Sequence, residues 1–165
     1  MSLCPQLRQL AAEHARWLLA LGSRAEGDQA GRGDRLLALW DAEILPHCRA
    51  EEEVLLPALA QRLCEADAVI VFTTGDHLVL RGLARDLRLA TGTTRDAAAA
   101  TFAAKLASHL IFEERTLLPA LQETLGCARL AELEGELTEA GSSRTPRPAD
   151  GPLATTAART IGSAP

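Results

Sequence analysis

The chain has 165 residues and a net charge of −5, and its hydrophobic fraction of 47% consists mainly of Leu and Ala, with no Tyr. This length suits one domain whose core folds without disulfides or a partner, and this composition favours helices over strands. The scattered basic residues exclude the basic stripe of a nucleic-acid-binding protein, and the lack of an apolar run of about 18 residues excludes a membrane span.

Four long segments carry apolar residues at intervals of three and four, which is the period of an amphipathic helix. These four predicted helices span about 5–25, 33–62, 66–90 and 94–125. Short polar stretches containing Gly, Asp or Thr separate them, and a shorter amphipathic helix is expected at about 127–139. Long helices with short connections predict an all-α, up-down-up-down four-helix bundle with this short extra C-terminal helix.

The C-terminal end has a different composition. From Gly141 onward Pro, Gly, Ser, Thr and Ala dominate without any apolar period, so we predict a bundle domain over 1–140 and a disordered tail over 141–165. The N-terminus lacks the basic segment and apolar core of a signal peptide. A cytoplasmic location is therefore expected.

The cysteines form no C-x-x-C pair, which argues against a structural zinc site. In a reducing compartment we interpret them as ordinary buried thiols. Cys48 directly follows His47, and a redox or metal role is the alternative interpretation for it. The four residues are Cys4, Cys48, Cys64 and Cys127.

Two stretches of the chain repeat each other, HCRAEEEVLLPAL at 47–59 and HLIFEERTLLPAL at 109–121. Each begins with a His that is followed four residues later by a Glu. This spacing stacks both side chains on one helical face, about 6 Å apart along the axis. Apolar residues one and two turns away share that face, so both pairs are predicted to point into the core.

The chain has four histidines, His14, His47, His77 and His109, and each predicted long helix contains one of them. In an antiparallel hairpin, two residues equally far from the turn stand at the same height. The midpoint of each successive pair falls in a predicted turn, so all four imidazoles are expected at one level of the bundle. Arg81 interrupts the apolar face of the third helix, and the pattern offers no explanation for it.

Four histidines and two glutamates in a dry core would be costly without compensating charge. A single H-x-x-x-E is a weak signal, and a lone buried His is usually an ordinary core residue. Here every His is used, the heights match and the two halves repeat, which favours a dinuclear metal site. Mixed His and carboxylate ligands suit iron or manganese, whereas zinc remains an alternative on affinity grounds. Magnesium and calcium prefer oxygen ligands.

The His-first order of the repeat resembles the hemerythrin-like family, whose hallmark is a repeated His-His-Glu pattern in a four-helix bundle, over about residues 5–125. Ferritin-like proteins use Glu-x-x-His instead, and no Glu or Asp lies three residues before any His of this chain. The resemblance implies two non-haem iron ions with an oxo or hydroxo bridge. The metal ligands that it implies are His14, His47, Glu51, His77, His109 and Glu113.

The chain departs from the oxygen-carrying members of that family at two positions. Their fifth His is replaced by Thr73, and their last carboxylate corresponds to Glu114, whereas the internal repeat favours Glu113 as the partner of Glu51. Pro57 and Pro119 are expected to bend their helices, more simply to close the bundle than to shape a pocket. The carboxylates off the ligand stripe, expected to be solvated, are Glu52, Glu53 and Glu114.

The missing fifth His implies open metal positions for O2, NO or peroxide, and hence sensing, scavenging or iron handling. One alternative is an iron-dependent protein-interaction module that uses 127–139 or the tail, although no protein partner can be named. Others are iron–sulfur repair, peroxide decomposition and a bundle that has lost its metal. The lack of Tyr argues against a radical-generating oxidase, and whether the protein is an enzyme stays open at this stage.

Overall fold

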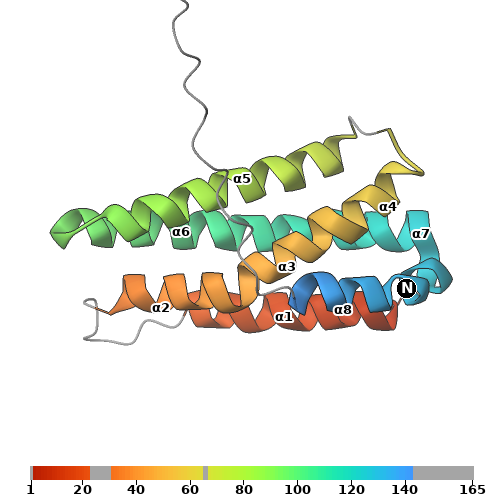
Figure 1. The fold of residues 1–165 in the computed structure, drawn as a ribbon, viewed down its shortest axis with the longest axis horizontal. Coiled ribbons are helices and arrows are strands. Elements are labelled where there is room, and N and C mark those ends of the chain that lie inside the picture. Colours follow the sequence, from red (N-terminus) through yellow and green to blue (C-terminus); the bar gives the residue numbers. More distant parts are fainter. Residues whose placement is uncertain (1, 23–30, 65–66, 143–165) are drawn as a thin grey trace, which may run out of the picture.

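The computed structural model of the chain describes residues 2–22, 31–64 and 67–142, and within them it contains helices but no strands (Figure 1). The predicted all-α class is therefore confirmed. None of the described helices has the length and apolar character that crossing a membrane requires. From residue 143 onward, the predicted disordered tail lies outside the described residues.

Four long helical rods and a short C-terminal helix make up the described structure. Three short π-helical segments, labelled η, interrupt the second and fourth rods. The rods are α1 (Pro5–Gly22), then α2 (Arg32–Leu39) with η1 (Trp40–Ile44), α3 (Leu45–Ala50), η2 (Glu51–Leu55) and α4 (Leu56–Ala60), then α5 (Ala68–Leu89), then α6 (Gly92–Phe112) with η3 (Glu113–Leu117) and α7 (Leu118–Glu132), followed by α8 (Glu134–Ser142).

Each rod contributes polar side chains to one shared level of the molecule, and this level lies between two apolar cores. α5 lies along α6, α1 contacts α6 and α7, α2 contacts α5 and α6, and α8 packs on α3 (Figure 1). One core includes Leu55 and Leu117, and the other includes Trp40 and Phe102. Along α1, α5 and the fourth rod a His, a Glu or both separate the residues of the two cores. On the second rod the two cores meet between Cys48 and Ala50, which His47 and Glu51 flank.

The C-terminal segment folds back over the rods. Gly126 adopts a positive φ of 70° inside α7, which breaks the helical course of the fourth rod close to the predicted boundary at 125. The helical chain then continues through Leu133, whose N–H bonds to the carbonyl of Arg129, and ends with α8. The predicted extra helix is thus present, and it extends to Ser142, past the predicted start of the tail at Gly141.

The π-helical segments are explained by three prolines. Each segment is followed by Leu-Pro, at Pro46, Pro57 and Pro119. A proline has no N–H to donate, and its ring crowds the preceding turn. The Leu before it donates instead to the carbonyl five residues back, which belongs to Trp40, Glu51 or Glu113. Two of the three irregular segments therefore begin at the repeated glutamates, Glu51 and Glu113. The sequence predicted bends at Pro57 and Pro119, farther along the helices. Such π-turns are frequent at functional sites.

The prediction of four ordinary buried thiols is wrong. Cys4 and Cys127 form a disulfide with a Cα–Cα distance of 5.4 Å, which ties the start of α1 to the segment after Gly126. Cys64 is exposed, so Cys48 is the one buried free thiol in the described part of the chain. The disulfide depends on the folding back of the C-terminal segment, which the spacing of the cysteines does not reveal.

Candidate metal centre

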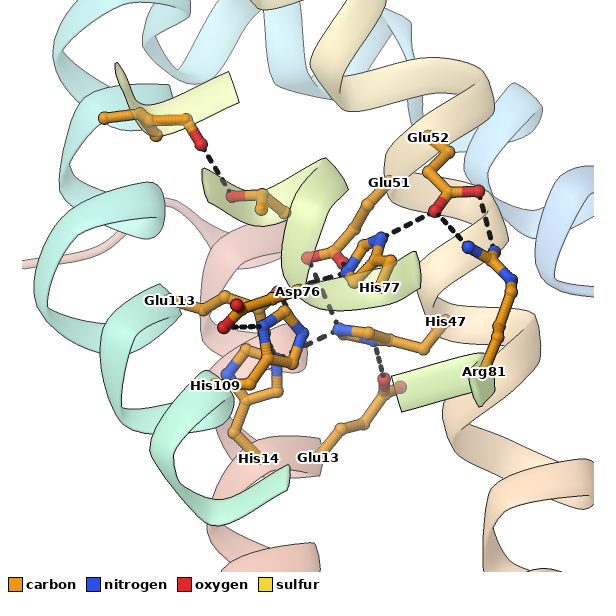
Figure 2. A network of polar contacts seen from close by, with 12 residues as sticks. Glu13, His14, His47, Glu51, Glu52, Asp76, His77, Arg81, His109 and Glu113 are labelled. Atoms are coloured by element: carbon orange, nitrogen blue, oxygen red, sulfur yellow. Dashed lines mark hydrogen bonds and ion pairs between the residues drawn. The ribbon is translucent and has the colours of Figure 1, made fainter. Parts of the chain in front are cut away.

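The six predicted ligand side chains meet in the middle of the molecule (Figure 2). α1 supplies His14, the second rod His47 and Glu51, α5 His77, and the fourth rod His109 and Glu113. All are buried, and His47, the most exposed, keeps only 7% of its surface accessible. The predicted common level of the four imidazoles is thus present in the structure.

Each glutamate spans two histidines from different rods. Glu51 places Oε1 3.4 Å from His47 Nε2 and Oε2 3.3 Å from His77 Nε2. Glu113 places Oε2 3.4 Å from His14 Nε2 and Oε1 2.9 Å from His109 Nε2. The two carboxylates therefore connect a pair formed by His14 and His47, whose Nε2 atoms are 3.0 Å apart, with a second pair formed by His77 and His109.

Most of the polar atoms facing this centre lack a hydrogen-bond partner. Eight buried side-chain atoms of the described residues have none, and seven of them belong to Glu51, His77, His109 and Glu113. An unsatisfied buried polar group ordinarily costs about 1–3 kcal/mol, and a charged one costs more. Carboxylate oxygens and imidazole nitrogens are good metal ligands. Cations at the centre would bind these atoms and offset the glutamate charges, so the residues present fit a metal.

The outward-facing nitrogen of every histidine points at a carboxylate other than Glu51 and Glu113. For His47, His77 and His109 this carboxylate comes from the preceding rod in the chain, and for His14 it comes from the last rod. Figure 2 shows the carboxylates of Glu13, Glu52 and Asp76 in these positions. The contact of Glu114 with His14 closes the contacts of the four rods into a ring around the centre. The distances to Nδ1 are 3.2 Å from Glu13 to His47, 2.8 Å from Glu52 to His77, 3.6 Å from Asp76 to His109 and 2.9 Å from Glu114 to His14. A carboxylate in this position fixes the ring orientation and directs Nε2 to a metal.

This ring corrects part of the sequence interpretation. Glu52 and Glu114 were expected to be solvated, yet both contact a histidine, whereas Glu53 is exposed as expected. Glu13 and Asp76 were missed. All four carboxylates stand one position from a predicted ligand, and an offset of about 100° turns a side chain from the centre of the bundle toward the neighbouring helix. Adjacency to a ligand was the available signal.

Arg81 finds its explanation in the same ring. Its guanidinium donates to both oxygens of Glu52, each at 2.8 Å, while one of these oxygens also bonds to His77. This bidentate contact holds the carboxylate in place. Lys105 makes an ion pair with Asp76 on the other side of α5.

The electrostatics of the centre favour charged carboxylates and protonation of His47, His77 and His109, whereas burial and the neighbouring His47 lower the pKa of His14. Burial raises the pKa of Glu51, but the His47 and His77 imidazoles outweigh this effect and hold the pKa well below its ordinary value. Burial lowers the pKa of His109, and its contacts with Cys48 and Glu113 outweigh this and raise it to about 9. The pKa of His77 is likewise raised above its ordinary value.

The two carboxylates of the ring that touch His47 and His77 are themselves held ionised. Burial raises the pKa of Glu52, but His77 and Arg81 outweigh it and lower the value to about 2. The pKa of Glu13 is also lowered, because its hydrogen bond to His47 outweighs the effect of burial. The ring therefore presents negative charge to the outer nitrogens of both histidines at neutral pH.

The donor atoms separate into two compact groups. One ligand atom from each of His14, His47, Glu51 and Glu113 lies within 4.8 Å of the other three. A second group on the same criterion contains Cys48, His77 and His109. Thr73, which stands at the fifth-histidine position, is buried and donates its hydroxyl hydrogen to the carbonyl of Val69, in its own helix.

A pocket of about 350 Å³ reaches the centre from the side of α8. Its lining includes Glu13, Trp17 and His47 from the inner side and Leu137 and Thr138 from α8. Of the six predicted ligands His47 alone lines the pocket, which thus leads from the surface to one member of the first histidine pair.

Comparison with known proteins agrees with this geometry. The hemerythrin HHE cation binding domain matches residues 4–121, which contain all six side chains and both groups of donor atoms. No curated protein and no solved structure matches the chain. A match over this much of the chain, together with a buried His/Glu cluster able to bind a metal, is decisive: the chain belongs to the hemerythrin HHE cation-binding domain family.

Proposed function

We propose that this protein holds two non-haem iron ions within an up-down-up-down four-helix bundle formed by the four rods. His14 and His47 would hold one ion, and His77 and His109 the other. Glu51 and Glu113 would bridge them, since each directs one oxygen toward each histidine pair. The observation that carries the proposal is the set of buried carboxylate oxygens and imidazole nitrogens that lack any hydrogen-bond partner.

Glu113 is favoured over Glu114 as the bridging residue. Glu113 has an exposed fraction of 0% and contacts imidazoles on three different rods. The carboxylate of Glu114 contacts the outer nitrogen of His14 and keeps 33% of its surface exposed. The internal repeat, which pairs Glu113 with Glu51, supports the same choice.

Small diatomic ligands or peroxide are the proposed substrates. When bound, a pair of iron ions supplies binding of O2, NO or peroxide and electron exchange between the ferrous and ferric states. The pocket beneath α8 provides a route of suitable size for such ligands to the first histidine pair. The surrounding residues bind and orient the ions, and the two apolar cores limit access of water from the ends of the rods.

Metal content and spectroscopy test this function. The protein is purified without oxygen, its iron, manganese and zinc are counted, and absorption spectra are recorded after O2, NO and peroxide are added separately. We expect two iron ions per chain and a spectral change with at least one of the reagents. Full iron loading with no response to any of them would refute the small-ligand function and leave only metal binding.

The ligand assignment has its own test. In the double variant His47→Ala, His109→Ala each proposed ion loses one ligand, so iron binding should be lost. The control is Glu53→Gln, because Glu53 is exposed and lies two residues from Glu51 in the same rod. Unchanged iron stoichiometry in the double variant would refute the assignment.

A second candidate, an iron-dependent interaction module, is favoured by a different feature. The outer face of α5 exposes Val71, Phe72, Leu78 and Val79, with exposed fractions of 48–65%. If that face bound a partner only when iron is present, chelation would both disrupt the helices and abolish the association. A small-ligand protein would lose its spectrum while its state of association stayed the same. Sedimentation of loaded and chelated protein distinguishes the two candidates.

The cytoplasmic location remains part of this proposal. Disulfides are rare in that compartment, so the Cys4–Cys127 bond provides the test. Thiols are alkylated at the moment of cell lysis. If the bond forms in the cell, Cys4 and Cys127 are protected from alkylation, which argues against a cytoplasmic location; if both are alkylated, the location is supported.

A further inference from the structure

Cys48 is completely buried beside the second histidine pair. Its exposed fraction is 0%, and one ligand atom from each of Cys48, His77 and His109 lies within 4.8 Å of the others. Cys48 follows His47 in α3, so the rotation of one residue turns its side chain away from His14 and toward α5 and α6. The second rod thereby contributes to both histidine pairs.

The nitrogens near this thiol make no hydrogen bond, although carboxylates of the centre lie close to them. Nε2 of His77 and both ring nitrogens of His109 make no hydrogen bond, although the two residues are 0% and 1% exposed. These unpartnered buried atoms are independent of the cysteine and point to a ligand in the same place. A buried thiol that serves only packing would not require them.

We propose that Cys48 is a ligand, through its sulfur, of the metal ion held by His77 and His109. The inference rests on the proposed function and extends it. Nitrogen and sulfur ligands lie about 2.1 and 2.3 Å from a zinc-sized ion, so two of them on one ion are at most about 4.4 Å apart. Around a tetrahedral ion they lie about 3.6 Å apart. Donor atoms that already lie within 4.8 Å of one another therefore need to approach by about 1 Å to share an ion.

This ligand makes the two metal positions chemically different. The ion near His14 and His47 would have nitrogen and carboxylate ligands, whereas the ion near His77 and His109 would add a thiolate. Thiolate ligands favour softer ions such as zinc and ferrous iron over manganese. The second position should therefore retain its metal more strongly, and the first should exchange more readily.

Cobalt(II) is the probe, because a thiolate bound to it gives a charge-transfer band in the near ultraviolet. All measurements use full-length protein carrying Cys64→Ala. This change removes the exposed thiol and, with Cys4 and Cys127 in their disulfide, leaves Cys48 as the only free one. Cobalt is added to this protein and to the same protein with Cys48→Ser or Cys48→Ala.

We expect the band in the parent protein and its complete loss in both Cys48 variants. X-ray absorption of the parent should also show sulfur at about 2.3 Å, averaging one sulfur atom for every two cobalt ions when both positions are filled. The second measurement requires no change at Cys48, so it decides the question even if the variants fold poorly.

The failure of the Cys48 inference and the failure of the proposed function give different results. Cobalt or iron bound by the parent without a sulfur neighbour would refute the role of Cys48 and leave the proposed function intact. Failure of the parent to bind any metal would refute both.

Discussion

Each of the two histidine pairs of the candidate metal centre contains one histidine of the sequence repeat, His47 or His109, but the pairs lie in different surroundings. The first pair consists of His14 and His47, of which His47 lines the pocket beneath α8. The second pair, His77 and His109, lies beside the thiol of Cys48 and between two carboxylates that are each paired with a basic residue. A repeated motif thus fixes where ligands converge, while neighbouring residues decide what each position can do.

This difference suggests unequal roles for the two proposed metal positions. Glu52 and Asp76, the carboxylates that touch the second pair, are held by Arg81 and Lys105. Glu13, which touches His47 of the first pair, lines the pocket instead. We infer that the second position anchors a metal and the first receives the small ligand. The predictions below test that contrast, from the largest expected effect to the smallest.

Removing a carboxylate that contacts both histidine pairs should abolish metal binding at both positions, and with it the difference between them. Because Glu113 contacts imidazoles of both pairs, Glu113→Gln should cause loss of both ions. Glu114→Gln is the matched control, since it removes only the contact to the outer nitrogen of His14 and should leave both ions bound with reduced affinity. Metal analysis after dialysis measures the outcome. The reverse result would make Glu114 the bridging residue.

Metal removal should destabilise the fold, and by more as the pH rises. In metal-free protein the raised pKa of His109 gives protonation a stabilising contribution that is fully present below about pH 6.5 and is lost as the pH rises through about 9. Metals compete with these protons, so their affinity increases over the same range.

Thermal unfolding with a chelator or with added metal measures this effect. Free metal at 100 times Kd stabilises by about 2.7 kcal/mol per site, which corresponds to a Tm difference on the order of 10 °C. The difference between the two samples should grow from pH 6.5 toward pH 9. A difference that shrinks would mean that the histidines are not protonated in the metal-free protein.

The carboxylates that touch the outer nitrogens should affect one position each. Glu52→Gln weakens the support of His77, and Glu13→Gln that of His47. Loss of such a contact typically reduces metal affinity 10- to 100-fold, or about 1.4–2.7 kcal/mol. In stepwise cobalt titrations, Glu52→Gln should weaken the site with the sulfur signature and Glu13→Gln the other. Glu53→Gln, at an exposed neighbouring position, should change neither.

The sequence predicted the convergence of the six side chains because the two patterns involved, residue spacing within a helix and distance from a turn, are both local. Spacings of three, four and seven residues place His47, Glu51 and their apolar neighbours on one face, and equal distances from the turns set the heights. Both rules depend only on helix geometry. The buried positions of these residues in the structure agree with them, while their roles as ligands remain a proposal.

The contacts that were missed depend on how one helix is rotated against the next. Glu52 and Glu53 are both off the ligand face, yet Glu52 meets His77 and Glu53 faces solvent. A periodic pattern within one helix does not choose between them. The Cys4–Cys127 disulfide likewise requires the C-terminal segment to fold back after Gly126. This folding back carries no local signature in the sequence, whereas the position of Glu52 next to Glu51 is a signal that the periodic pattern does not use.

The smallest predicted effect concerns access to the first position. Thr138 on α8 lines the pocket, so Thr138→Trp should fill part of it and slow the binding of NO to iron-loaded protein, with little change in metal content. The matched control is Glu136→Trp, which adds the same bulk to an exposed position of α8 outside the pocket lining. Stopped-flow absorption measures the rate. Equal rates in both variants would mean that small ligands reach the iron by another path, and the contrast between an accessible and an anchoring position would then lose its basis.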